Sequence, residues 1–289
     1  MTRYIPFIFV LLWSTGFVGA KFGLPYAEPF TLLMWRMAFV VPLFVLLIIV
    51  FKHPKINFFD ALIQGLVGLL IHGLYLGGVF AAIDRNFPSG LAALIVSLNP
   101  LFIAVFSGLI LSNAITKREW LGLSLGFLGV AIVLYGASNW GGVITIDGFI
   151  WLVFSLLGLV TGTLLQKRYA QHVDLLTGSS YQYLAAFIFF FLMSFFLETQ
   201  EIEWTINLAL TLAWLIFALS LSAILLLLYM IRQGEAARVA SYFYLVPPLA
   251  VFWGWLFFDE KWSWLTLIGS LLVVFSLILS KPSSKVTKI

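Results

Sequence analysis

The sequence has no cysteine and few charged residues. None of its 289 residues is Cys, which excludes disulfides, thiolate chemistry and Cys-ligated metals. Asp, Glu, Lys and Arg make up 10% of the chain, against roughly a quarter in a soluble domain. The chain also lacks a Gly-x4-Gly-Lys-Ser/Thr phosphate loop and a His-Glu-x2-His metal motif. We therefore expect no catalytic residues, no bound metal and no cofactor, and the protein is not expected to be an enzyme.

What the chain has in excess is apolar surface. Hydrophobic residues make up 62% of it, with 29 Phe and 11 Trp, and the mean hydropathy is +1.08. A protein of this composition is solvated by lipid. The net charge of +4 comes from Lys and Arg residues scattered between apolar runs. This placement indicates membrane topology and does not predict a nucleic-acid partner.

Ten apolar runs are long enough to cross a bilayer as helices, which takes about 20 residues each. The first is too long for a signal-peptide core and is interpreted as a retained span. The connections are short and hold no soluble domain. The sequence thus predicts an all-α integral membrane protein with spans at about 4–22, 30–51, 61–82, 88–111, 120–137, 148–166, 179–197, 208–231, 238–258 and 264–280.

The positive charges set the orientation, because Lys and Arg concentrate in cytoplasmic loops. With both termini in the cytoplasm, only Lys21, Arg85 and Lys261 fall outside, and Arg36 lies within a span. The remaining Lys and Arg fall inside, at positions 3, 52, 55, 117, 118, 167, 168, 232, 238, 281, 285 and 288. An odd number of spans would break this pattern. We expect a multi-pass protein of the cell (inner) membrane.

A repeated pattern divides the chain. Thr15, Gly16 and Lys21 recur 146 positions later, as Thr161, Gly162 and Lys167, and Pro100 recurs 147 positions later as Pro247. This predicts two related halves, residues 1–143 and 144–289, each with five spans. Five is odd, so the second half enters the membrane from the opposite face, as in inverted-repeat transporters. The two lysines are expected to be anchors that snorkel where their spans leave the membrane.

Several motifs carry a family resemblance. They are "WSTGFVGAKFGL" in the first span, "MWRMAF" in the second, and "ARVASYFYLVPPLAVFWGWLFFDEKWSWLTLIGSLLVVFSLIL" over 237–279. With the ten spans, these resemble the EamA branch of the drug/metabolite transporter superfamily. The resemblance implies a bundle of five plus five helices around a cavity lined by spans 1, 3, 4, 6, 8 and 9. One departure is visible: Glu260 ends the ninth span, whereas Asn113 stands where the family often has Glu after the fourth.

Two ionisable side chains lie within spans, where polar groups are costly and tend to face a protein interior. Arg36 could attract an anionic or carboxylate-bearing substrate, or snorkel to the outer interface or cap a neighbouring helix. Gln182 occupies its place in the second half. His72 could couple transport to protons, or be held by hydrogen bonds between helices. Tyr75 shares its face. No Asp or Glu is expected at mid-membrane depth.

The other cavity candidates are hydroxyls, an amide, prolines and aromatic rings. Ser14, Thr15, Thr161 and Thr163 stand near glycines whose small-x3-small spacing also predicts close helix packing. Asn99 beside Pro100, and Ser241 before Pro247 and Pro248, lie where a proline would break a helix and free polar backbone. Aromatic rings complete the set, at Trp13, Trp253, Tyr229, Tyr242 and Tyr244, and they face either the cavity or lipid.

These features predict a secondary transporter, an exporter of small metabolites, amino acids or drug-like compounds by alternating access. A sugar-phosphate or nucleotide-sugar exchanger is the alternative within the superfamily, although its cargo would call for several basic side chains in the cavity. A channel, a lipid translocator and an intramembrane enzyme are the alternatives from other classes. The expected partners are the lipid bilayer and a small-molecule substrate, and the sequence leaves the oligomeric state open, a monomer included.

Overall fold

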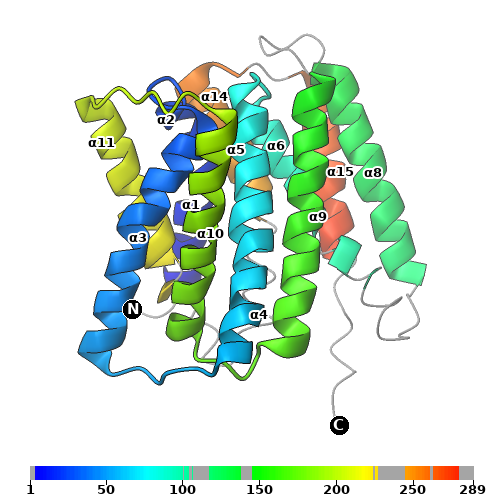
Figure 1. Ribbon diagram of the computed structural model, residues 1–289. Coiled ribbons are helices and arrows are strands. Elements are labelled where there is room, and N and C mark those ends of the chain that lie inside the picture. The colour runs from blue at the N-terminus through cyan, green and yellow to red at the C-terminus, as the bar shows by residue number, and fades with distance from the viewer. Residues whose placement is uncertain are drawn as a thin grey trace.

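A computed structural model describes residues 4–99, 101–103, 106, 117–137, 145–223, 225–226, 245–260 and 263–279. This part of the chain is a bundle of helices (Figure 1), and its one β pairing is an isolated bridge between Ala27 and Ile202. Its elements are α1 (Ile5–Ser14), α2 (Gly16–Gly23), α3 (Pro29–Phe51), α4 (Phe58–Gly68), the π-helix η2 (Leu69–Leu76), α5 (Gly77–Asp84), α6 (Ser89–Val96), α8 (Lys117–Ala137), α9 (Ile146–Tyr169), α10 (Leu175–Leu197), α11 (Ile206–Ala213), the π-helix η3 (Trp214–Ala223), α14 (Val246–Phe258) and α15 (Trp264–Leu279).

Within the part of the chain that the structure describes, six helical stretches are long and apolar enough to cross a membrane. They are Ile5–Gly23, Pro29–Phe51, Phe58–Asp84, Ile146–Tyr169, Leu175–Leu197 and Ile206–Ala223. Each coincides with a predicted span, which supports a multi-pass helical membrane protein. The helices α6, α8, α14 and α15 fall on the other four predicted ranges, and the count of ten spans stays a prediction.

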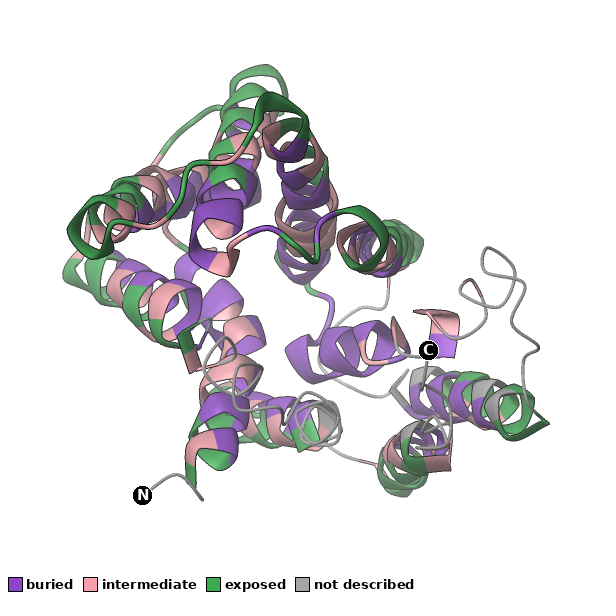
Figure 2. Ribbon diagram, turned by 90° about the horizontal axis from the view of Figure 1, so that it is seen from below, coloured by how far each residue is buried: buried purple, intermediate pink, exposed green. Residues whose placement is uncertain are grey.

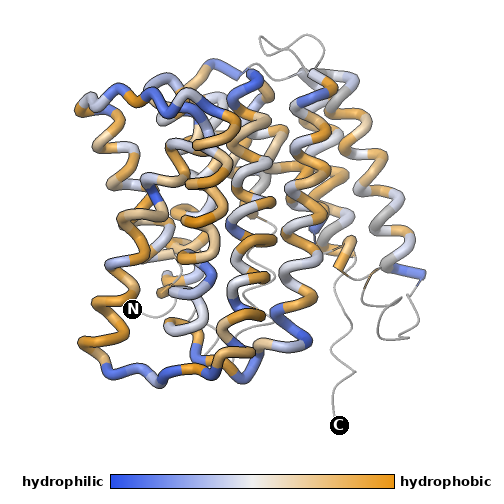
Figure 3. Tube along the Cα trace, in the orientation of Figure 1, coloured by the Kyte–Doolittle hydropathy of each residue, from blue (hydrophilic) through white to orange (hydrophobic). Residues whose placement is uncertain are grey.

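The outer surface of the bundle is apolar between two hydrophilic ends. Large side chains such as Phe51, Phe196 and Leu271 are more than half exposed, which suits contact with lipid chains. Hydrophilic segments gather at the top and bottom of the bundle in Figure 3. Viewed from below in Figure 2, buried residues face the interior and exposed residues face outward. The same physical pattern explains why hydropathy alone located the spans.

Side-chain caps explain where several helices begin. Asn57, Thr145, Asp174 and Thr205 each accept a hydrogen bond from the backbone N–H three residues on, at the starts of α4, α9, α10 and α11. Such caps satisfy N–H groups that have no partner within the helix. Pro29 starts α3, where its missing N–H costs nothing. The turns between spans are therefore encoded locally by ordinary capping residues.

Helices from the two sequence halves pack in antiparallel pairs. In the α3–α10 pair, Thr31 Oγ1 and Ser194 Oγ share a hydrogen bond of 2.6 Å near one end. At the other end, His53 Nδ1 lies 3.0 Å from Asp174 Oδ1. The α8–α15 pair approaches so closely that a Cβ on Gly129 would lie 2.7 Å from the Gly269 carbonyl oxygen. Only glycine permits this separation.

The bundle has two ends, named here by one residue each. The Lys21 end carries the connections 24–28, 85–88 and 198–205, and the His53 end carries 52–57 and 170–174.

At the Lys21 end, Glu198 caps α3 by accepting hydrogen bonds from Phe30 N at 2.8 Å and Thr31 N at 2.7 Å. Burial raises the pKa of the Glu198 carboxyl, and these hydrogen bonds oppose the rise only in part.

Asp174 plays the corresponding capping role at the His53 end. Burial by itself would raise its pKa, but hydrogen bonds from Thr177 N and Oγ1 and the nearby His53 outweigh burial, so the pKa lies below its ordinary value. A depressed pKa in the folded state means that the carboxylate stabilises the fold. This contribution is present above the pKa of the unfolded chain, and it is lost as the pH falls through the folded pKa.

We therefore expect Asp174→Ala to lower the free energy of unfolding by about 1 kcal/mol at neutral pH, because a helix cap is lost. Thermal unfolding of the purified protein at pH 7 and at pH 3 measures the effect. The difference from the parent should shrink at the lower pH, because protonation of this carboxyl group removes the stabilisation that its depressed pKa provides. Glu201→Ala, at an exposed loop position, is the control and should change little at either pH. A difference for Asp174→Ala that persists undiminished at pH 3 would contradict this account.

Candidate functional site

A polar cluster lies where η2 and η3 meet α3 and α10. Arg36 of α3 is buried, with 6% of its surface exposed. Its Nε and Nη2 donate hydrogen bonds of 3.1 and 2.9 Å to Ser220 Oγ, on η3. Arg36 therefore points into the bundle and not to the outer interface, which rules out the snorkelling interpretation. π-Helical segments are often found at functional sites because they widen the helix and displace side chains.

Aromatic groups from two further elements surround this pair. Tyr183 of α10 lies with its hydroxyl 3.5 Å from the Ser220 carbonyl oxygen. Its ring stacks on the imidazole of His72, with centroids 4.4 Å apart and planes 21° from parallel. Tyr75, three residues beyond His72 on η2, is close enough to Arg36 for an electrostatic interaction. The structure thus brings three predicted site residues, Arg36, His72 and Tyr75, into one cluster.

A network of amide side chains continues the cluster toward the His53 end. Gln182 Nε2 donates hydrogen bonds to Gln64 Oε1 at 2.6 Å and to Gln166 Oε1 at 3.1 Å. These residues belong to α10, α4 and α9, so the network joins three helices. Gln64, Gln166, Tyr183 and Ser220 were not predicted as site residues. In the sequence these four are polar residues within apolar runs. That pattern does not show which of them face one another.

The charge at the centre of the cluster is uncompensated among the described residues. No Asp or Glu within the part of the chain that the structure describes forms an ion pair with Arg36. Its hydrogen-bonding partner, Ser220, is neutral and 1% exposed. A buried cation without a counter-ion is costly. The arrangement can therefore accept an anionic group.

A second polar group lies at the break between α1 and α2. Ser14 Oγ accepts a hydrogen bond of 2.9 Å from Trp253 Nε1 of α14, and it donates to the Leu11 carbonyl oxygen. Thr15 Oγ1 accepts one of 3.0 Å from Trp214 Nε1 at the start of η3. These bonds tie the first span to α14 and η3. Trp13 instead packs against Phe9 of its own helix, with ring centroids 5.4 Å apart.

The other predicted site residues that the structure describes do not join the Arg36 cluster. Thr161 is exposed and Thr163 half-buried, and both hydroxyls donate to carbonyl oxygens of their own helix. Asn99 Oδ1 is buried and accepts no hydrogen bond from the described residues. Pro247 and Pro248 lie in the first turn of α14, which begins there without a break. The predicted candidates Pro100, Tyr229, Ser241 and Tyr244, with Asn113, lie outside the described residues.

The Thr-Gly repeat supplies glycines at helix contacts. A Cβ on Gly158 would lie 2.8 Å from the Leu70 carbonyl oxygen, so α9 lies directly against the backbone of η2. Gly162 faces Leu70 and Ile71 on the same π-helix. In the first half, Gly16 faces Leu219 of η3. These glycines therefore permit close packing between a span of one half and a π-helix of the other.

A charged contact links three helices at the Lys21 end. Lys21 Nζ lies 2.9 Å from Glu260 Oε1 and 4.4 Å from the centre of the Phe258 ring. The same carboxylate accepts hydrogen bonds from Ser89 N at 3.0 Å, Ser89 Oγ at 2.9 Å and Gly90 N at 3.4 Å. This contact joins α2, the end of α14 and the start of α6. The sequence analysis did not predict this carboxylate partner, and the snorkelling of Lys21 stays a prediction.

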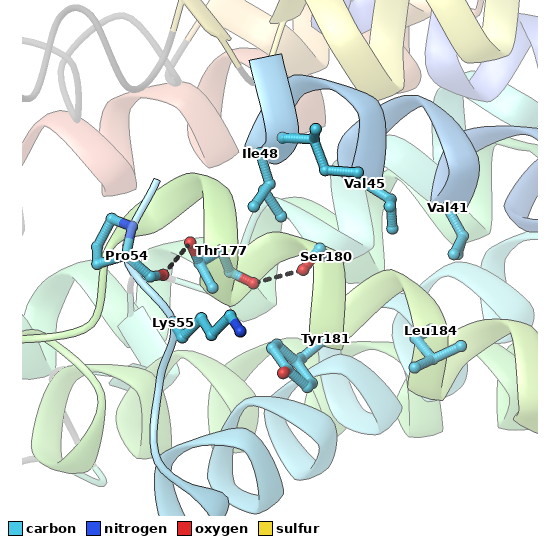
Figure 4. Close-up of a pocket in the computed structure, with 10 residues that line it drawn as sticks. Val41, Val45, Ile48, Pro54, Lys55, Thr177, Ser180, Tyr181 and Leu184 are labelled. Atoms are coloured by element: carbon cyan, nitrogen blue, oxygen red, sulfur yellow. Dashed lines mark hydrogen bonds between the residues drawn. The ribbon is translucent and has the colours of Figure 1, made fainter. Parts of the chain in front are cut away.

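An apolar groove of about 270 Å³ lies between α3 and α10 at the His53 end (Figure 4). Thr177 Oγ1 donates to the Pro54 carbonyl oxygen at its edge, and Ser180 Oγ donates to the Thr177 carbonyl oxygen. None of its lining residues belongs to the Arg36 cluster. They are Val41, Val45, Ile48, Ile49, Pro54, Lys55, Thr177, Ser180, Tyr181 and Leu184.

Comparison with known proteins assigns the chain to a family. The EamA-like transporter family matches residues 4–135 and again residues 146–281. An uncharacterized transporter of Bacillus subtilis, YvbV, is 27% identical, covering 96% of this chain and 91% of its own length. The uncharacterized inner membrane transporter YedA of Escherichia coli is 26% identical, covering 94% and 88%. The chain belongs to the EamA-like transporter family, which confirms the resemblance that its motifs carry.

Two further matches bear on fold and cargo. A protein named a probable amino-acid metabolite efflux pump, from Salmonella typhimurium, is 25% identical over 58% of this chain and 54% of its own length. One solved crystal structure superposes with a TM-score of 0.64 at 19% identity and covers 96% of both chains. That structural likeness supports the fold alone. The family and these names indicate a membrane transporter.

The Lys21–Glu260 contact predicts coupled stabilities. In a double-mutant cycle, Lys21→Met and Glu260→Gln should show a coupling energy of about 0.5–1 kcal/mol, because Lys21 is partly exposed to solvent. Glu260→Gln should cost more than Lys21→Met, since the carboxylate also accepts hydrogen bonds from the start of α6. Thermal unfolding in detergent measures both. The control cycle, Lys55→Met with Glu260→Gln, should be additive, and additivity for Lys21 as well would contradict the contact.

Proposed function

We propose that this EamA-like transporter is a secondary exporter of small organic metabolites that works by alternating access across two inverted five-span halves. The observation that carries the proposal is the composition of the buried polar cluster. Arg36, His72 and Tyr75 come from the first sequence half, and Tyr183 and Ser220 come from the second. A site at the interface of two inverted repeats, built in part from irregular helix, is where such transporters bind cargo.

Reciprocal contacts at the two ends support the inverted repeat. At the Lys21 end, Glu28 Oε2 accepts hydrogen bonds from Thr199 N and Oγ1 at 2.8 and 3.0 Å. Adding 146 to Glu28 gives Asp174, and subtracting 146 from Thr199 gives His53. These two residues form the 3.0 Å contact at the opposite end. A contact and its exchanged copy at opposite ends are what a two-fold axis in the membrane plane would produce.

The π-helices support the same relationship. Shifting Leu69–Leu76 by 146 gives residues 215–222, which lie within the second π-helix, Trp214–Ala223. Each π-helix packs on glycines of the opposite half, η2 on Gly158 and Gly162, and η3 on Gly16 and Gly19. The two separate matches to one family, over 4–135 and 146–281, agree with a division of the chain near residue 143.

The two ends would act unequally as gates. The Lys21 end has a carboxylate that holds three helices together. The equivalent position in the first sequence half is Asn113, which carries no charge. Alternating access requires the Lys21–Glu260 contact to break when the cavity opens toward that end. We propose that this contact is one gate of the transport cycle.

The nature of the cargo follows from the cluster and one relative. A single cation with phenol, imidazole and amide groups suits small amphipathic compounds. The name of the Salmonella relative, a probable amino-acid metabolite efflux pump, adds amino acids and outward transport to the proposal. By the distribution of Lys and Arg, both termini and the His53 end would face the cytoplasm, so export would release cargo at the Lys21 end.

Topology can be tested with cysteines, because the chain has none of its own. Lys55 and Glu201 are exposed and occupy equivalent positions, 146 residues apart. Lys55→Cys and Glu201→Cys should react with a membrane-impermeant thiol reagent from opposite sides of sealed right-side-out vesicles, Glu201→Cys from outside. Labelling of both from the same side would exclude the inverted repeat. The parent chain, which should not react, is the control.

Gating can be tested by closing the Lys21 end covalently. In proteoliposomes, the Lys21→Cys/Glu260→Cys variant should lose efflux of an amino-acid and metabolite panel when a short bifunctional thiol reagent joins the two positions. A cleavable reagent should restore efflux after reduction. Lys55→Cys/Glu201→Cys, whose thiols lie at opposite ends, is the control and should keep its activity. Undiminished transport by the cross-linked protein would overturn alternating access through this end.

A further inference from the structure

Arg36 is held in a way that leaves its charge available. A guanidinium group has five N–H donors in a planar fork. The two hydrogen bonds that the structure records for it both go to one oxygen, Ser220 Oγ. The side chain is nevertheless buried within the bundle, with 6% of its surface exposed. A cation placed there at such cost, with one neutral hydroxyl as its acceptor, indicates a group that binds something else.

The acids of the described chain are too far away in the fold to act as its counter-ion. Each lies at an end of the bundle, where several already hold other partners: Glu260 binds Lys21, Glu198 caps α3, and Asp174 binds His53. Asp60 is held by His172 and Asn57. The groups next to Arg36 are instead uncharged or weakly basic. Among the described residues, the single positive charge of Arg36 is therefore left without a counter-ion at the centre of the cluster.

Two groups of the cluster are less buried than the others. Ser220 and Tyr183 are buried, with 1% and 2% of their surfaces exposed. His72 and Tyr75 are only partly buried, although they lie at the middle of a span and adjoin these buried groups. A ligand that reached Arg36 would meet the phenol of Tyr75 and the imidazole of His72. These groups donate hydrogen bonds and supply flat faces for an apolar substituent.

We propose that Arg36 binds the carboxylate group of the transported substrate, with Ser220 holding the guanidinium in place. The inference rests on the proposed transport function and names its substrate class. A planar carboxylate matches the two-pronged guanidinium fork, and one negative charge balances one positive charge. A phosphate monoester carries nearly two charges and finds no second cation among the described residues of the cluster. The same contact makes the neutral amide of a substrate a poor ligand.

Matched pairs of probes test this assignment with the full-length protein. Each pair is a free acid and its amide: L-phenylalanine with L-phenylalaninamide, L-leucine with L-leucinamide, and 3-phenylpropionate with 3-phenylpropionamide, with phenyl phosphate as an added arm. Apparent affinity is measured as inhibition of efflux in proteoliposomes and as ligand-induced thermal stabilisation in detergent. The parent should bind at least one acid about tenfold or more tightly than its amide. A tenfold difference in affinity corresponds to about the free energy that one hydrogen bond to a charged group contributes.

Arg36→Gln should remove the difference between acid and amide by weakening the acid and leaving the amide unchanged. A purely structural role for Arg36 would weaken both members of a pair alike. Arg36→Lys keeps the charge but loses the planar fork, so it should retain a smaller preference for the acid. This variant tests carboxylate binding by itself if Arg36→Gln does not fold. Arg85→Gln, which removes an arginine at the Lys21 end, is the control and should keep the full preference.

The possible outcomes separate the two proposals. Acids and amides that act equally on the parent, or an acid preference that survives in Arg36→Gln, would overturn carboxylate binding while leaving the transport function intact. Tighter binding of phenyl phosphate than of every carboxylate would replace the proposed substrate class by phosphate esters. A parent that transports no compound of the wider metabolite panel would overturn the proposed function, and the inference with it.

Discussion

The absence of hydrogen-bonding solvent inside a bilayer is the constraint on which this structure depends. Every polar group within a span must find its partner in the protein. The hydroxyls of Thr161 and Thr163 do so on their own helix, and those of Ser14 and Thr15 also bind tryptophans of other spans. Longer polar side chains reach between helices, as Gln182 does to Gln64 and Gln166. Each interhelical bond therefore fixes which helices are neighbours.

Close backbone contact supplies the rest of the cohesion. Because lipid is as apolar as the helix surfaces, spans gain little by burying leucine and rely on packing and hydrogen bonds. Gly129 with Gly269, and Gly158 with Leu70, bring backbones together where a side chain would not fit. The second of these contacts involves a π-helix, so the same element that packs tightly on a glycine also presents Tyr75 and His72 toward Arg36. Packing and site geometry are thus coupled.

Much of the fold was predictable because hydropathy reports depth. The six long spans were placed correctly as helices. Arg36, His72 and Tyr75 were predicted as candidate site residues because ionisable or polar side chains are rare within spans. Ser220, Tyr183 and the glutamine network were missed, since one more hydroxyl or amide in an apolar run is ambiguous. The contact between Lys21 and Glu260 was missed for a related reason: the two residues lie 239 positions apart, and no local pattern connects them.

The sequence by itself determined that this is a multi-pass helical membrane protein of the EamA-like transporter type, and where its long spans and capped turns lie. These properties depend on composition and on interactions within a few residues, such as Asp174 with Thr177. Only the tertiary structure decided that Arg36 points inward to Ser220, that His72 stacks on Tyr183, and that Lys21 meets Glu260. Hydropathy sets the depth of a side chain but not the direction in which it points around its helix. That direction is set by packing between helices far apart in the chain.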